Sequence, residues 1–274
     1  MIKDVTIIIP SMRASEFALE QCTDSLMKTA FDIVNKEMGL IVATNGYDPA
    51  TDGKPNQVGD IHISFQGQCK AVNAAVAITN TEWIFVSNDD MVYPPNWWEK
   101  LSDFVENNRQ IKCISPNLVE PRPGAPPFVY FPCGGAGGDF DKDKFYKFAD
   151  KYRHFKLEEG FNLPFLMKRD LWNLIGGYDI NYDPWGSNSD SDLQTKIYLA
   201  GEKTWRYHNV IVYHFGQTSG TFHPDNRKHW QKNRDYFIKK WGFPRQGDDQ
   251  KVWYSKDLID YEKLIYKPKW AVLR

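Results

Sequence analysis

Two adjacent carboxylates follow a short apolar run in this sequence. Residues 83–86 read Trp-Ile-Phe-Val, and Asp89 and Asp90 come shortly after them. Adjacent carboxylates with no cysteine ligand nearby suit a hard divalent cation such as Mg²⁺ or Mn²⁺, which prefers oxygen ligands and often holds substrate phosphates as well. The alternative is structural, because aspartate is common in turns and the pair could simply cap the turn before Pro94. The residue types alone leave both interpretations open.

The elements that must position this pair alternate along the first hundred residues. Short apolar runs predict strands at residues 5–9, 39–45, 60–64 and 83–86, and helical spacing predicts helices at 17–27 and 69–78. Strands separated by helices form a parallel sheet with right-handed crossovers, and ligands of such sheets bind beyond the carboxyl ends of the strands. We therefore expect Asp89 and Asp90, at the end of the fourth strand, to face a cleft.

The rest of the chain predicts a long loop between further helices and strands. Pro94 and Pro95 predict the start of a helix, whose apolar face would comprise Trp97, Trp98, Leu101, Phe104 and Val105. Residues 115–138 are too rich in proline and glycine for a regular element, and such long loops are often functional lids. Beyond this loop we expect helices at 142–155, 190–200 and 226–241, a strand and a short helix within 161–179, and a strand at 210–215.

Composition limits the class of protein. Of the 274 residues, 42% are apolar and 25% are charged, which predicts a globular protein with a core of its own. A net charge of -1 argues against nucleic acid as the default partner. With no apolar stretch of about 18 residues and no leader, we expect a cytoplasmic protein without a membrane span. Buried free thiols are expected at the four widely spaced cysteines, Cys22, Cys69, Cys113 and Cys133.

Several segments together resemble a known family. FVSNDDMVYPPNWWEKL resembles the D-x-D region of family 2 glycosyltransferases with the GT-A fold, where an acidic pair precedes a proline and an amphipathic helix. VTIIIPSMRASEFALEQCTDSL is similar to the family's first strand and helix, and GQCKAVNAAVAIT to its donor segment. GGYDINYDPWGSNSDSDLQTKIYLAG, with VIVYHFG after it, is similar to the G-G-F-D, E-D-x-D-L and histidine block, and RKHWQKNRDYFIKKWG to the closing basic helix. The resemblance covers residues 4–243.

The resemblance implies an α/β fold of the GT-A type, with a mostly parallel nucleotide-binding sheet flanked by helices and a smaller acceptor-side region. It implies one glycosyltransferase domain at residues 1–243, with a nucleotide-sugar half at 1–115 and an acceptor and catalytic half at 116–243, before a C-terminal extension at 244–274. It also implies transfer with inversion from a nucleotide-sugar donor, UDP-sugars being favoured, to a saccharide or glycoconjugate, with Mn²⁺ or Mg²⁺ as the cofactor.

The resemblance also assigns roles to residues at the matching positions. Asp190 in SDSDL takes the place of the family's catalytic base, with Asp192 as the fallback; an N-cap role for Asp190 is the structural alternative, and both roles could hold at once. Asp89, Asp90 and His214 are the expected metal ligands, although a histidine after a strand is more often structural. The expected donor contacts lie near the strand ends, at Pro10, Ser11, Arg13, Asn45, Lys70, Asn73, Asn88 and Asp89.

The chain departs from the family pattern at three positions. Asn45 stands where many relatives carry an aspartate that reads uracil, so the base of the donor is left open. Ser87 or Asn88 replaces the first acid of the D-x-D, and Ser189 replaces the glutamate before Asp190.

Three rival functions fit parts of the same pattern. A sugar nucleotidyltransferase shares the sheet and the metal, but PSMRASE lacks the glycines of its first loop. A non-catalytic nucleotide-sugar-binding module would not need Asp89, Asp90, Asp190 and His214 together. A glycosyltransferase acting on modified nucleic acid would use the cations and aromatics interleaved in RKHWQKNRDYFIKKW, which the near-neutral net charge disfavours.

Overall fold

The computed structural model describes residues 1–30, 33, 39–46, 61–63, 67–123, 127–216, 218 and 223–244. The expected C-terminal extension therefore lies, from residue 245 onward, outside the described residues. None of the helices in these ranges is long and apolar enough to cross a membrane.

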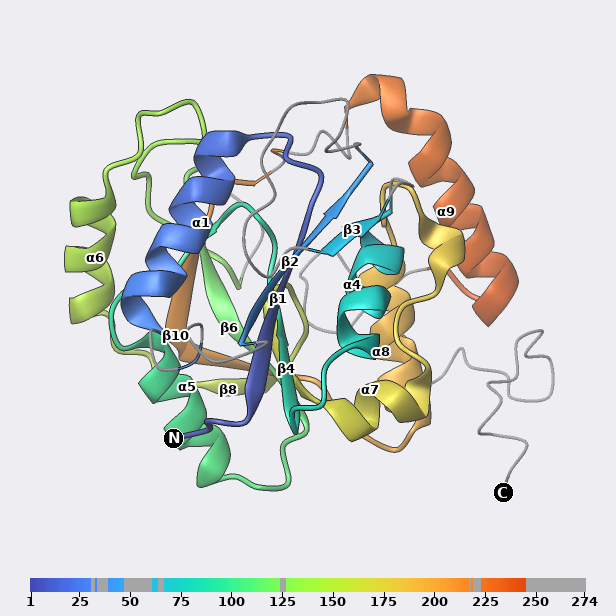
Figure 1. The fold of residues 1–274 in the computed structure, drawn as a ribbon, viewed down its shortest axis with the longest axis horizontal. Helices are drawn as coiled ribbons and strands as arrows, with labels where there is room; N and C mark the ends of the chain where they lie inside the picture. The colour runs from blue at the N-terminus through green and yellow to red at the C-terminus, as the bar shows by residue number, and fades with distance from the viewer. Residues whose placement is uncertain are drawn as a thin grey trace.

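One ten-stranded sheet forms the centre of the described structure (Figure 1). Its strands are β1 (Val5–Ser11), β2 (Leu40–Asn45), β3 (Ile61–Ile63), β4 (Trp83–Val86), β5 (Met91–Val92), β6 (Cys113–Glu120), β7 (Val129–Tyr130), β8 (Leu157–Glu159), β9 (Phe165–Lys168) and β10 (Trp205–His214). The strand order is β3-β2-β1-β4-β9-β6-β10-β5, with β7 beside β6 and β8 beside β10. The first four strands pair in parallel, as the sequence predicts.

Strand β9 runs antiparallel to both of its neighbours, β4 and β6. Two antiparallel pairings in succession restore the original direction, so β6 and its parallel partner β10 point the same way as β1 to β4. The carboxyl ends of β1, β2, β3, β4, β6 and β10 therefore lie along one edge of the sheet. This is the edge at which ligands of parallel sheets bind.

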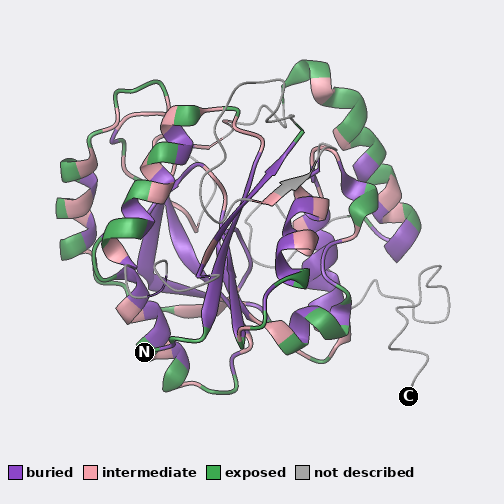
Figure 2. Ribbon diagram, in the orientation of Figure 1, coloured by how far each residue is buried: buried purple, intermediate pink, exposed green. Residues whose placement is uncertain are grey.

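Helices cover both faces of the sheet (Figure 1). They are α1 (Glu16–Thr29), α4 (Gln68–Ala77), α5 (Trp97–Glu106), α6 (Lys142–Lys151), α7 (Arg169–Ile175), α8 (Ser189–Leu199) and α9 (Arg227–Trp241), with short 3₁₀ turns at Ile180–Tyr182 and Pro224–Asn226. In β1, Ile8 packs into a core shared with α4, α7, α8 and α9, whereas Ile7 and Ile9 pack into a core shared with α1 and α5. A third core lies under α6. The strands between these cores are almost entirely buried (Figure 2).

The apolar face predicted after the two prolines is confirmed, but its helix begins later. α5 starts at Trp97, and its tryptophans, Leu101 and Val105 are buried. Phe104 packs at the edge of this face, with its ring stacked on Tyr207 at a centroid distance of 3.9 Å. The helix predicted at 142–155 ends at residue 151, and the strand predicted at 210–215 begins at residue 205.

The predicted loop at 115–138 begins instead as a strand. β6 extends through residue 120 although Pro116 lies within it. Proline has no N–H to donate and is tolerated in sheets mainly at edges and bulges. Here Pro116 is paired with Tyr207, and the register between β6 and β10 shifts between Tyr207 and Ile211. The proline thus occupies an irregular point of the ladder, which the composition of the segment does not reveal.

Side chains from three segments fix the start of α4 against the sheet. Asn45, at the end of β2, donates to the Ser11 carbonyl oxygen at 3.2 Å and accepts from the Gly67 N–H at 2.9 Å. The Asp183 carboxylate accepts from the first backbone N–H groups of α4, at Cys69 (2.9 Å) and Lys70 (3.1 Å). Gly67 leaves room for this carboxylate, because a Cβ at position 67 would overlap it.

We expect Gly67→Ala to lower the free energy of unfolding by about 1 to 2 kcal/mol, the contribution of a helix N-cap, because the added methyl group displaces the capping carboxylate. Urea denaturation measures the change. Gly137→Ala is the matched control, since its added Cβ meets no atom within 4 Å. Equal stability of the two variants would contradict the capping role of Asp183.

Candidate active site

The carboxyl edge of the sheet gathers the polar residues expected at the strand ends. Ser11 ends β1, Asp89 and Asp90 follow β4, and His214 ends β10. A residue not predicted from the sequence, Glu120, ends β6 between them. These five residues do not form a local motif in the sequence. The pairing of the strands brings them to one edge of the sheet.

Asp89 contacts the end of the first strand. Its Oδ2 accepts a hydrogen bond of 2.6 Å from the Ser11 hydroxyl. Burial, followed by the charge of Asp90, raises the pKa of Asp89 to about 7, although the bond from Ser11 lowers it. Without a bound cation, two adjacent carboxylates at this depth do not readily carry two full charges.

Asp90, His214 and Glu120 form a chain of polar contacts. Asp90 Oδ2 lies 3.5 Å from His214 Nε2, and His214 Nδ1 lies 2.9 Å from Glu120 Oε1. The Thr218 hydroxyl donates to Asp90 Oδ2 at 3.0 Å, and the Phe215 N–H donates to the Asp90 carbonyl oxygen. Burial alone would lower the pKa of His214, but the two carboxylates raise it to about 10. Burial would likewise raise the pKa of Asp90, and the imidazolium and the hydrogen bonds lower it.

This chain fits a divalent cation in its donor types and in the orientation of the ring. Carboxylate oxygen and imidazole nitrogen are both ligands of Mn²⁺, and a metal-bound histidine usually donates its other N–H to a carboxylate. Glu120 is placed to accept that N–H, which leaves Nε2 facing Asp90. Among the described residues, no three His, Cys, Asp or Glu side chains form a preformed metal site. Asp90 and His214 would therefore hold an ion together with oxygens from the donor or water.

Asp190 lies on the other side of the sheet from α1, at the start of α8. Its Oδ1 accepts a hydrogen bond of 2.9 Å from the Tyr178 hydroxyl. Burial, the largest cause, and nearby charges that include Asp190 raise the pKa of the Cys69 thiol well above its ordinary value, so Asp190 lies near the first turn of α4. The N-cap position of α8 belongs to Asn188, which makes no capping bond with its side chain. The structural alternative for Asp190, an N-cap role, is therefore wrong.

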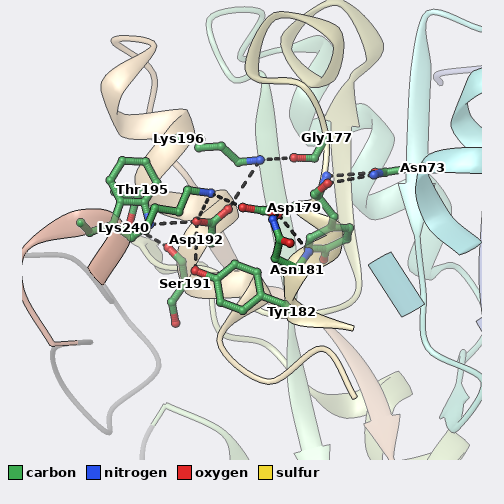
Figure 3. A network of polar contacts seen from close by, with 12 residues as sticks. Asn73, Gly177, Asp179, Asn181, Tyr182, Ser191, Asp192, Thr195, Lys196 and Lys240 are labelled. Atoms are coloured by element: carbon green, nitrogen blue, oxygen red, sulfur yellow. Dashed lines mark hydrogen bonds and ion pairs between the residues drawn. The ribbon is translucent and has the colours of Figure 1, made fainter. Parts of the chain in front are cut away.

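The structure argues against Asp192 as the fallback base. Its side chain is fully buried, and Oδ1 contacts Lys240 Nζ at 2.7 Å and accepts from Trp241 Nε1 at 2.8 Å (Figure 3). A base must reach the acceptor hydroxyl, and this carboxylate is enclosed by α8 and α9. The resemblance ranked Asp190 before Asp192, but sequence spacing does not show in which direction the first turn of α8 points each carboxylate.

The expected donor contacts divide into two groups. Asn45 and Asn73 have structural partners: Asn45 joins β1 to α4, and Asn73 both donates to the Tyr178 carbonyl oxygen and accepts from its N–H. The others lie at or beside the carboxyl ends of β1 and β4, or in the first turn of α4: Pro10, Ser11, Arg13, Asn88, Asp89 and Lys70. For the residues of both groups, contact with a donor stays a prediction.

The segment before α6 is tied to the strand that ends at His214. The Tyr213 hydroxyl accepts from the Cys133 N–H at 3.0 Å and donates to the Gly134 carbonyl oxygen at 2.7 Å. The carboxyl-terminal end of the predicted lid is therefore anchored next to His214. Closure of the segment on a bound donor stays a prediction.

Sequence reasoning missed three residues of the site: Glu120, Tyr178 and Thr218. The proline within β6 hid the strand that Glu120 ends. Tyr178 lies in the GGYD segment that carries the family resemblance. Its hydrogen bond to Asp190 depends on the turns between the two residues, which the sequence does not reveal.

Comparison with known proteins bears on the fold of the chain and on the family resemblance of residues 6–122. Residues 6–122 match the sequence model of the family described as Glycosyl transferase family 2. No curated protein sequence matches the chain. Among solved structures, a crystal structure of GalNAc-T7 with UDP, GalNAc and Mn²⁺ is similar, with a TM-score of 0.51 and 13% sequence identity. The similarity covers 77% of this chain and 42% of the GalNAc-T7 chain.

The expected fold class is thereby confirmed: a mixed α/β structure of the GT-A type with a mostly parallel sheet between helices. The family 2 match covers residues 6–122, less than half of the chain, and the fold is similar to that of the GalNAc-T7 structure.

Proposed function

We propose that this protein transfers a sugar, with inversion, from a nucleotide-sugar donor to a hydroxyl group of a saccharide or glycoconjugate, with Mn²⁺ or Mg²⁺ as cofactor. The observation that carries the proposal is the pairing of Asp90 with His214 at the carboxyl edge, with Glu120 behind the histidine. These residues would hold a divalent cation, which would stabilise negative charge on a diphosphate. The UDP and Mn²⁺ in the GalNAc-T7 structure support a uridine nucleotide and Mn²⁺ as the first choices to test.

The residues on the donor side would act on the leaving group. Departure of a nucleoside diphosphate builds negative charge, and fixed positive groups at that point lower the barrier. When bound, the cation would supply Lewis-acid stabilisation of this charge. Asp90 and His214 would hold the cation, Glu120 would keep the imidazole oriented, and Ser11 would orient Asp89 beside them.

Asp190 would act on the acceptor side as the general base. An alcohol is far too weak an acid to ionise at neutral pH, so its proton must pass to a base as the new bond forms. Tyr178 donates to one carboxylate oxygen of Asp190, which orients the carboxylate. Burial, the largest cause, together with the charge of Asp190 raises the pKa of Tyr178 well above its ordinary value, so the phenol stays protonated as the donor of this bond.

We expect Asp190→Asn to lower kcat by about 10²- to 10⁴-fold, the usual contribution of general base catalysis, because an amide cannot accept a proton at neutral pH. Its melting temperature and donor affinity should stay those of the wild type. Steady-state kinetics with a panel of nucleotide sugars and Mn²⁺, together with thermal unfolding, measures both.

Asp192→Asn is the matched comparison, and it should instead lower the free energy of unfolding by about 3 to 5 kcal/mol, because it breaks a buried ion pair. Turnover of Asp190→Asn near the wild-type rate would rule out Asp190 as the base.

We expect nucleoside diphosphate to bind more tightly in the presence of Mn²⁺ than in the presence of a chelator. Glu120→Ala should weaken nucleotide binding in the presence of Mn²⁺ by about 10- to 100-fold, as is usual when the carboxylate behind a metal-bound histidine is lost. Isothermal titration calorimetry of the wild type and the variant tests this. Asp143→Ala, an exposed acidic residue on α6, is the control. Equal nucleotide affinity with Mn²⁺ and with chelator would remove the metal from the proposal.

A further inference from the structure

A buried lysine of α9 lies between two aspartates that flank the Tyr178 and Asp190 pair. Lys240 Nζ is 2.7 Å from Asp179 Oδ2 and 2.7 Å from Asp192 Oδ1 (Figure 3). Asp179 directly follows Tyr178, and Asp192 lies two residues after Asp190. The Tyr178 to Asp190 hydrogen bond and the lysine contacts therefore link the same two segments at two points.

A second buried lysine reinforces this link from within α8. Lys196 Nζ donates to the carbonyl oxygen of Gly177, the residue before Tyr178, and lies 3.6 Å from Asp192 Oδ2 (Figure 3). Tyr178 is thus held on its amino-terminal side by Lys196 and on its carboxyl-terminal side, through Asp179, by Lys240. Both lysines are almost fully buried.

The inward face of α9 contacts the rest of the connecting segment. The Tyr236 hydroxyl donates to Asp179 Oδ2 at 2.9 Å, and Trp241 Nε1 donates to Asp192 Oδ1 at 2.8 Å. Asn233 Nδ2 donates to the carbonyl oxygen of Tyr182 at 2.6 Å. The helix that resembled a nucleic-acid-binding element in sequence therefore directs several of its polar side chains into the protein.

Stability alone does not account for charges at this depth. Phe237 and Trp241 already give α9 an apolar contact with the core. Burying ions costs desolvation free energy, and well-packed apolar residues are often as stable or more stable in their place. Burial alone would lower the pKa of Lys240, yet Asp192 and Asp179 raise it, so the ammonium stays charged. What charged groups add to an apolar contact is a defined geometry between particular atoms.

We propose that Lys240 is a positioning residue, which sets the register between residues 177–179 and the first turn of α8 and so holds Asp190 against Tyr178 at the acceptor. The inference rests on the proposed function of Asp190 as the base. Lys240 then acts on the geometry of the site through the segments that it holds, without touching the reacting atoms.

A double-mutant cycle with hydrogen exchange tests the proposal. Lys240→Met is made in the wild type and in Asp190→Asn, and Lys239→Met, an exposed neighbour on the same helix, is the control. Asp179→Asn serves as a milder second variant, because it removes one contact of Lys240 and leaves the pairing with Asp192. The measurements are amide hydrogen exchange, nucleoside diphosphate affinity with Mn²⁺, kcat and the donor KM.

We expect Lys240→Met to speed exchange at residues 177–192 while β1 and β4 stay protected. In the wild-type background kcat should fall by about 10²-fold, the loss that a displacement of about 1 Å can cause, with the donor KM and the nucleotide affinity unchanged. In the Asp190→Asn background the same substitution should change kcat by less than about twofold, because coupled residues are not additive. Asp179→Asn should show the same pattern with smaller changes, and Lys239→Met should match the wild type.

Unchanged exchange at residues 177–192 in both Lys240→Met and Asp179→Asn would overturn the proposal, whether or not the enzyme turns over. An equal fall of kcat in the two backgrounds would overturn it as well, since it would show a general loss of structure. Absence of sugar transfer or donor hydrolysis by the wild type would contradict the proposed function itself, and the exchange measurement would still decide whether Lys240 sets this register.

Discussion

The arrangement of this site depends on the direction in which each strand of the sheet runs. Strand β9 runs antiparallel between β4 and β6, and this inversion keeps β6 and β10 parallel to β1, β2, β3 and β4. Glu120 and His214 therefore lie at the same edge of the sheet as Ser11 and Asp89. If β9 paired in parallel with β4 and kept its antiparallel pairing with β6, then β6 and β10 would be reversed and His214 would lie at the opposite edge, far from Asp89 and Asp90.

Two clusters of charged side chains are buried in this protein, and burial of each cluster costs desolvation free energy. Asp90 and His214 lie against one another with Glu120 behind the ring, and Lys240 lies between Asp179 and Asp192. In both clusters each buried charge has an opposite charge within 4 Å, as buried ions require. The two clusters lie in different parts of the fold. The first lies at the carboxyl edge of the sheet, and the second lies between α9 and α8, the helix that carries Asp190.

The sequence predicted the features that depend on local pattern, such as the first four strands. It did not predict the features that depend on contacts between residues far apart in the chain. The apolar runs of the first four strands, with polar residues directly after them, were enough to predict the edge where Asp89 and Asp90 lie. Pro116 concealed β6, because its tolerance depends on an irregular pairing with β10 that no local rule contains. The resemblance gave Asp190 as the base and Asp192 as the fallback, and only the structure shows that Asp192 is buried against Trp241 and Lys240, which lie far away in sequence. Asn45 stands at a position that the family resemblance assigns to the nucleotide, and the sequence did not reveal that its amide also joins β1 to α4.

The two sides of the site rest on different hydrophobic cores. Tyr213 and Phe215, on either side of His214, pack under α6, whereas Tyr178 and Leu193, near Asp190, pack with α4, α7 and α9. Substitutions in separate, non-contacting clusters generally have additive effects on stability. We therefore expect substitutions that change the packing around Tyr178 and Leu193 to leave the packing around Tyr213 and Phe215 intact.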